Sequence, residues 1–278
     1  MLKKIVIIAC TACVVVFSAN LFIRKNLELD NPVFLQHFYY FSNFDVGHDI
    51  RLKYISNKSD DKTIKNISFP QWEELEIKNV YIGDDFRYGM YDITTVCVEP
   101  ILDGYSEIPE KTLTKATVKY SDGYEETVDI GKIILKKDAP SKELLNFSSS
   151  YASSSGDSST TSTVSENCTL VNIYHAYKDD LNDEITIKIN GNTPSLPMQF
   201  YKGDIVKTET VFNTPNGLNR YNEYDINVEL TMNDENGDTS SKHLYNINYS
   251  PEFTQRTVKA YLEMIGAIPK YIDFLNLL

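Results

Sequence analysis

The sequence has few of the residues that usually mark a metal site or an active site. Its 278 residues include one Trp, four His and four Cys, and no two histidines lie at the spacing of metal ligands. Because a structural zinc site normally shows closely spaced Cys or His pairs, the sequence predicts neither a metal nor a cofactor. A Gly-x-Ser-x-Gly nucleophile motif, a phosphate-binding loop and a dinucleotide-binding fingerprint are all missing. We therefore expect no catalytic or cofactor-binding residues and a protein that is not an enzyme.

Basic residues are also in short supply. The chain has 27 Lys and Arg against 39 Asp and Glu, which gives a formal net charge of -12 at pH 7. A negative surface repels the phosphates of nucleic acids. We therefore expect no nucleic-acid partner.

One long apolar run lies near the N-terminus. Residues 5–23 carry no charged side chain, two lysines precede them, and Arg24 and Lys25 follow. The run is long enough to cross a hydrocarbon core as a helix, and the preceding lysines are typical of a cytoplasmic end. We expect residues 1–25 to form a signal anchor of a single-pass cell-membrane protein, with the bulk of the chain outside the cytoplasm. Cleavage near residues 16–18, which would give a secreted protein, is the alternative.

The cysteines fall into two pairs. Cys10 and Cys13 lie within the apolar run, where a thiolate would be costly, so their spacing predicts no redox or metal site. Cys97 and Cys168 remain for the rest of the chain. They are compatible with one disulfide or with two buried free thiols.

The rest of the sequence favours strands. Tyr and Phe are abundant, with 19 and 13 copies, and such side chains fit a pleated, half-buried surface. Residues 49–55 alternate between apolar and polar types, as a half-buried strand does. Asp122 and Gly123 lie between two further alternating runs and predict a hairpin, because Gly accepts the positive φ of the turn. The expected fold is mainly β, with two small β-sandwich (Ig-like) modules after the N-terminal transmembrane helix and a short C-terminal helix.

Composition suggests how these modules are divided. Residues 146–166 are rich in Ser and Thr and poor in apolar groups, so we expect a flexible linker there. The alternative is a single sandwich with a long surface loop. The expected segments are an anchor over 1–25, a first module over 26–145, the linker over 146–166, a second module over 167–250, and an amphipathic helix over 251–278.

Two segments next to the modules have their own patterns. Residues 31–44 are rich in aromatic side chains, which suits either a stretch at the membrane interface or a first segment packed on the body. Near the other end, Ser250, Pro251 and Glu252 are typical of a helix start, and apolar residues recur after them at helical spacing.

Three groups of polar residues merit inspection in a structure. Residues 234–238 (Asp-Glu-Asn-Gly-Asp) resemble the start of a calcium loop, but the glycine and the final Glu of an EF-hand are misplaced, which favours a hairpin turn. The His48–Asp49 pair could meet His175 in space. If the protein were a hydrolase, the acidic cluster at Glu73, Glu74 and Glu76 beside Trp72 would be the candidate, although loop charge explains it equally simply.

These patterns predict a non-enzymatic binding or scaffolding module of a bacterial cell envelope. Its expected partner is a membrane or envelope protein, or a cell-wall polymer. Two alternatives stay open: an extracytoplasmic hydrolase acting on wall polymer, which needs two convergent carboxylates in an aromatic cleft, and an accessory subunit of a membrane complex.

Overall fold

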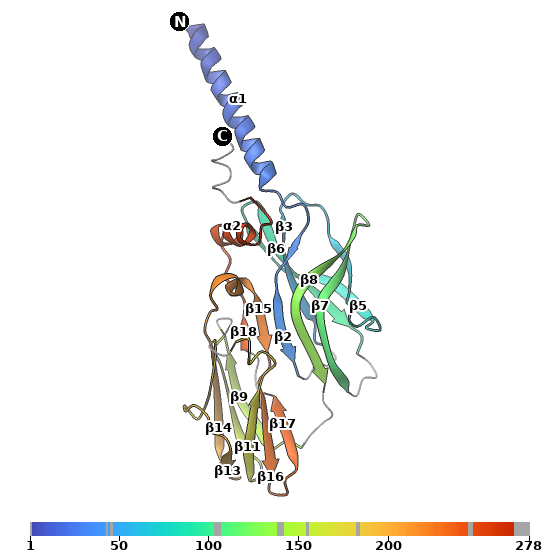
Figure 1. Cartoon of the computed structure of the whole chain (residues 1–278), viewed down its shortest axis with the longest axis vertical. Coiled ribbons are helices and arrows are strands. Elements are labelled where there is room, and N and C mark those ends of the chain that lie inside the picture. Colours follow the sequence, from blue (N-terminus) through green and yellow to red (C-terminus); the bar gives the residue numbers. More distant parts are fainter. Residues whose placement is uncertain are drawn as a thin grey trace.

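The protein is mainly β, as predicted. A computed structural model describes residues 2–42, 44, 47–102, 107–137, 142–153, 156–181, 184–243 and 247–269, with the backbone alone for residues 2–9, 12 and 241–243. The strands form three four-stranded sheets and one six-stranded sheet. Figure 1 shows them as two sandwiches stacked along the long axis, with one long helix projecting from the upper end.

The first sandwich uses the N-terminal half of the chain. One sheet has the order β1-β3-β6-β5, and it packs against β2, β8, β7 and β4 of the six-stranded sheet. These strands are β1 (Val33–Phe34), β2 (His37–Phe41), β3 (Ile50–Asn57), β4 (Ile64–Ser68), β5 (Ile77–Tyr88), β6 (Tyr91–Pro100), β7 (Ile108–Tyr120) and β8 (Glu125–Lys137). The predicted hairpin is confirmed, because β7 and β8 pair around Gly123, which has a φ of 88°.

The second sandwich packs two four-stranded sheets around their own core, with the orders β12-β14-β10-β9 and β13-β11-β16-β17. Their strands are β9 (Leu145–Ala152), β10 (Ser158–Val164), β11 (Cys168–Tyr174), β12 (Ile185–Ile189), β13 (Met198–Phe200), β14 (Ile205–Phe212), β16 (Glu229–Asp234) and β17 (Thr239–His243). The finer prediction of Ig-like modules is not confirmed by these sheet orders.

The prediction of a flexible linker over residues 146–166 is wrong, because β9 and β10 occupy most of it. Burial alternates along β10, as in a strand with one buried face. Ser158, Thr160 and Ser162 are buried, while the residues between them are partly exposed. Two of these residues bond side chains of β14: Thr210 bonds the Ser158 hydroxyl, and Thr208 Oγ1 donates to the Thr160 backbone carbonyl at 3.2 Å. β-branched Thr and hydrogen-bonded hydroxyls suit a strand that has few apolar side chains.

The six-stranded sheet connects the two sandwiches. Its order is β18-β15-β2-β8-β7-β4, with β15 (Glu223–Ile226) and β18 (Ile247–Tyr249) supplied by the C-terminal half. β2 runs parallel to both of its neighbours, β15 and β8. Tyr39 and Phe41 of β2 lie in the first core, whereas Tyr40 lies in the second. The aromatic stretch over residues 31–44 therefore packs on the body as β1 and β2 rather than lying at a membrane interface.

The long helix α1 (Leu2–Asn26) stands away from both sandwiches (Figure 1). Its large apolar side chains between Val14 and Ile23 are 43% to 65% exposed. Within the part of the chain that the structure describes, no helix combines the length and the apolar character needed to cross a membrane. The predicted span over residues 5–23 stays a prediction, since residues 5–9 and 12 lie outside the described side chains.

The predicted C-terminal helix is present as α2 (Gln255–Met264), but it begins later than expected. Thr254 caps it instead of Ser250, because Thr254 and Thr257 bond each other's backbone N–H groups reciprocally. Val258, Tyr261 and Leu262 pack it against β3, β6 and the short 3-10 helix η1 (Gly217–Tyr221). Residues 270–278 of the expected helix lie outside the described residues.

Candidate functional site

The candidate site lies where the chain crosses from one sheet of the first sandwich to the other. β1 covers only two residues of β3, and then the chain enters β2 of the opposite sheet. His37, at the start of β2, completes the interrupted ladder: its Nε2 accepts from the Lys53 backbone N–H at 2.8 Å. Its Nδ1 is then the protonated nitrogen and donates to the Ile130 carbonyl at 3.1 Å. Beyond this crossing, no described strand other than β6 pairs with β3.

His37 is a structural residue. It is fully buried, and burial lowers the pKa of its imidazole to about 3. The ring is therefore neutral at physiological pH, as the tautomer with one donor and one acceptor requires. Gly131 of β8 lies directly across from it, and a side chain there would collide with the His37 backbone. Gly131 also has a φ of 91°, which favours glycine.

A buried ion pair holds the two walls of the site together. Lys53 of β3 places its Nζ 2.8 Å from Glu223 Oε1 on β15 and donates to the Ser250 hydroxyl at 2.6 Å. Ser250 in turn donates to Glu223 at 3.1 Å. The Glu223 side chain is 7% exposed and that of Lys53 is 23% exposed. Burial raises the pKa of Glu223 above its ordinary 4.5, and the nearby Lys53 opposes the rise. The pair thus fixes the wing formed by β15 and β18 beside the first sandwich.

Between these walls is a cleft of about 310 Å³. On the β3 side it is lined by Asp49 and Arg51. On the wing, Asp225 and Asn248 are direct cross-strand partners and therefore present their side chains on one face. Two aromatic side chains of β2, those of Tyr39 and Phe41, also line the cleft, as do Asp84 of β5 and Thr95 of β6.

The lining mixes hydrogen-bond donors and acceptors with apolar ring surface. Asp49 accepts a hydrogen bond from the Tyr81 hydroxyl at 2.5 Å, which holds its carboxylate at the rim. Burial raises the pKa of the Tyr39 hydroxyl well above its usual 10, and the Glu223 carboxylate adds to the rise, so this hydroxyl stays protonated. Carboxylates outnumber cationic groups in the lining, which disfavours an anionic ligand. A neutral ligand with many hydroxyl groups suits this lining, because each hydroxyl both donates and accepts.

The sequence candidates are scattered. His48 and Asp49 line the cleft, but His175 lies in the second sandwich, after β11. Burial lowers the pKa of His175 to about 4, and its Nδ1 is buried without a hydrogen-bond partner among the residues that the structure describes. The acidic cluster at residues 73–76 is exposed in the turn around the buried Trp72, which supports its interpretation as loop charge.

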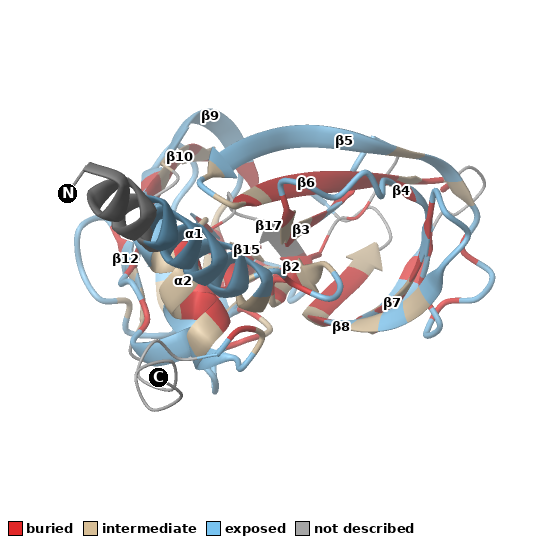
Figure 2. Ribbon diagram, turned by 90° about the horizontal axis from the view of Figure 1, so that it is seen from above, coloured by how far each residue is buried: buried red, intermediate tan, exposed pale blue. Residues whose placement is uncertain are grey.

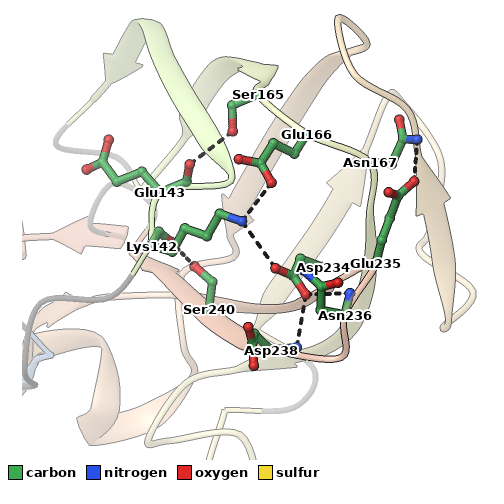
Figure 3. Close-up of polar contacts among 10 residues, drawn as sticks. All are labelled: Lys142, Glu143, Ser165, Glu166, Asn167, Asp234, Glu235, Asn236, Asp238 and Ser240. Atoms are coloured by element: carbon green, nitrogen blue, oxygen red, sulfur yellow. Dashed lines mark hydrogen bonds and ion pairs between the residues drawn. The ribbon is translucent and has the colours of Figure 1, made fainter.

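The turn over residues 234–238 is the connection between β16 and β17, as the hairpin interpretation predicted (Figure 3). Asp234 Oδ1 accepts from the backbone N–H groups of Asn236 and Asp238 at 2.8 and 3.0 Å. Its Oδ2 lies 3.1 Å from Lys142 Nζ, which also pairs with Glu166 at 2.6 Å. Oδ1 of Asp234 therefore closes the turn, and Oδ2 ties the turn to Lys142.

The two remaining cysteines are free thiols, which decides between the two alternatives left by the sequence. Cys97 of β6 belongs to the first sandwich and Cys168 of β11 to the second, and both are buried. Burial raises the pKa of each thiol. Among the described residues, no group of three His, Cys, Asp or Glu side chains is placed to hold a metal ion.

Comparisons with known proteins give little further guidance. No protein-family model matches the chain, and no curated protein matches it. Among solved structures, it is similar to the sialic acid binding region of a Streptococcus sanguinis SK1 adhesin bound to 3'sLn, at 9% identity and a TM-score of 0.20, over 80% of this chain and 78% of that chain. Similarity at this level establishes no shared ligand.

Proposed function

We propose that this chain is a non-enzymatic binding protein of the cell envelope, and that the cleft beside β3 takes a neutral, hydroxyl-rich polymer such as a segment of cell-wall glycan. The cleft itself is the observation that carries the proposal. One wall comes from β3 and its neighbours and the other from the wing of β15 and β18, and the Lys53–Glu223 pair holds them in place before any ligand arrives. A preformed site loses little conformational entropy on binding.

Each part of the lining has a role in this proposal. Arg51 donates to ligand oxygens, and Asp225 accepts from ligand hydroxyls. Asn248 does both, from the strand next to Asp225. The largely buried rings of Tyr39 and Phe41 give the cleft part of its apolar lining.

The experiment measures binding of the full-length protein, in detergent, to soluble wall fragments and to neutral oligosaccharides by isothermal titration calorimetry. We expect Asn248→Ala and Arg51→Ala each to weaken binding about tenfold, because each removes one charged or amide hydrogen-bonding group. Asn172→Ala is the matched control, since Asn172 is also an exposed strand asparagine but lies on β11, away from the cleft. Equal affinity of all three variants, or no binding by the wild type, would refute the proposal.

A hydrolase is the second candidate, and one observation favours it. Glu223 and Asp225 are two residues apart on one strand, both line an aromatic cleft, and burial raises the pKa of Glu223. An acid with a raised pKa is a common general acid. Release of reducing ends from wall polymer, lost in Asp225→Asn, would establish this activity. No release above background would leave the binding function.

We further propose that the N-terminal segment holds the protein at the cell membrane, with both sandwiches outside the cytoplasm. The apolar side chains between Val14 and Ile23 do not pack on the body, and a soluble protein seldom exposes so many on one element. Membrane fractionation followed by mass measurement of the intact chain tests this. Retention in the carbonate-washed membrane with an uncut N-terminus is the expected result, whereas a shortened, soluble chain would support secretion after cleavage.

A further inference from the structure

The strand β5 forms an open edge of the first sandwich. In the described part of the chain this 12-residue strand pairs with β6 alone. Figure 2 shows it as a mostly exposed strand arching beside β6. Three of its large apolar side chains, those of Tyr81, Ile82 and Phe86, are 41%, 47% and 53% exposed. An exposed edge strand with apolar side chains is a template for pairing with another strand.

The sequence of β5 is complementary to itself when two copies run antiparallel. With the two-fold axis at Tyr81, Val80 of one copy faces Ile82 of the other, and the cross-strand partners of these residues on β6 are Val98 and Val96. On either side of this apolar centre, Lys78 faces Asp84 of the second copy. Two opposite-charge pairs therefore flank two apolar pairs.

The irregularities of β5 fit the same axis. The strand has register shifts between Ile77 and Asn79 and between Ile82 and Asp85. Such bulges normally protect an edge from pairing. In a pair centred on Tyr81, the shift at Lys78 of one copy lies opposite the shift near Asp84 of the other copy. The two irregular places therefore coincide, whereas a regular strand from another protein would match neither of them. This favours a second copy of the chain as the partner of the edge.

We propose that two copies of this chain associate through β5, by antiparallel pairing of their edges around Tyr81 into one continuous eight-stranded sheet. The interface is isologous, so each contact occurs twice. The Lys78 side chain is 64% exposed and its 2.7 Å pair with Glu99 lies at the surface, so it can reach the second copy at small cost. Asp84 also lines the cleft, so dimerisation is measured without any cleft ligand present.

The test is sedimentation velocity of the full-length protein in detergent micelles over a range of concentrations. Each charge reversal, Lys78→Asp or Asp84→Lys, creates two like-charge pairs and is expected to weaken dimerisation about tenfold. The double variant Lys78→Asp/Asp84→Lys restores opposite charges and should return to within about threefold of the wild type. Lys207→Asp on β14 is the matched control, because Lys207 also forms an exposed strand pair, at 2.5 Å with Glu209.

Several results would overturn the proposal. A wild-type monomer at every concentration would do so, as would a dimer that neither single reversal weakens. The latter would indicate association through α1. A dimer weakened by both reversals but not rescued in the double variant would also contradict the register. Ile82→Asn gives a second check, since its half-exposed side chain tolerates a polar replacement in the monomer but not in the interface.

Discussion

Removing Lys53 isolates the energetic role of the ion pair that fixes the cleft. Lys53→Met keeps most of the aliphatic stem but leaves Glu223 buried without its cation. Leaving one buried charge unpaired typically costs about 3–5 kcal/mol. Because water reaches the Lys53 side chain, which is 23% exposed, we expect a smaller loss, about 2–3 kcal/mol of unfolding free energy at neutral pH.

The loss should depend on pH in a defined direction. Burial raises the pKa of Glu223 above its ordinary 4.5, and Lys53 is the group that lowers it, so the variant raises this pKa further. A carboxyl whose folded pKa is raised stabilises the fold fully below its unfolded pKa, and that contribution is lost as the pH rises through the folded pKa. The cost of Lys53→Met therefore grows as the pH rises above 4.5. Below that pH a proton replaces the missing cation, and the cost falls to about 1 kcal/mol or less.

Urea unfolding of the full-length protein measures this, followed by the fluorescence of Trp72, the single Trp of the chain, which is 3% exposed. The double variant Lys53→Met/Glu223→Gln has no buried charge and should recover most of the lost stability at neutral pH. Lys78→Met is the control for an exposed pair and should change stability by less than about 1 kcal/mol at either pH. An equal loss for Lys53→Met at neutral and acidic pH would refute the reasoning.

Two further predictions concern groups that support the site. Thr254→Ala removes the capping box of α2 and should cost about 1 kcal/mol of unfolding free energy, measured by the same urea titration, whereas Thr254→Ser should be nearly neutral. For His37, whose folded pKa is lowered from 6.5 to about 3, stability present above pH 6.5 is lost as the pH falls towards 3. His37→Gln should flatten this acid dependence while lowering stability at neutral pH, and an unchanged slope would contradict the buried neutral imidazole.

Local patterns predicted local structure well. The β7–β8 hairpin follows from Asp122 and Gly123 between alternating runs, because turn and strands are neighbours in sequence. Apolar residues at helical spacing likewise predict the helix that the structure shows as α2, although its cap is Thr254. Ser250 satisfies the same sequence rule, but tertiary contacts take its hydroxyl into the network with Lys53 and Glu223.

Composition led to a wrong prediction in one segment, where the alternation of buried and exposed side chains decides the structure. The Ser/Thr-rich segment over residues 146–166 has too few apolar groups for a typical core, which predicted a flexible linker. In the structure the segment is held by its pairing with β14 and by side-chain bonds from Thr208 to the Thr160 carbonyl and between Thr210 and the Ser158 hydroxyl. The signal that could have identified β10 was its β-branched residues, Thr160, Thr161, Thr163 and Val164, which favour a strand.

The cleft could not be predicted from patterns among residues that are neighbours in the sequence. Lys53 occupies the polar phase of an alternating strand, where the pattern predicts a solvated side chain, and Glu223 lies 170 residues away. What brings them together is the parallel pairing of β2 with β15. That pairing arises because the chain leaves β3 after two residues of β1 and carries His37 into the opposite sheet. The chemistry of the site is therefore a property of this crossing, and the same lining residues on a chain without this crossing would not meet.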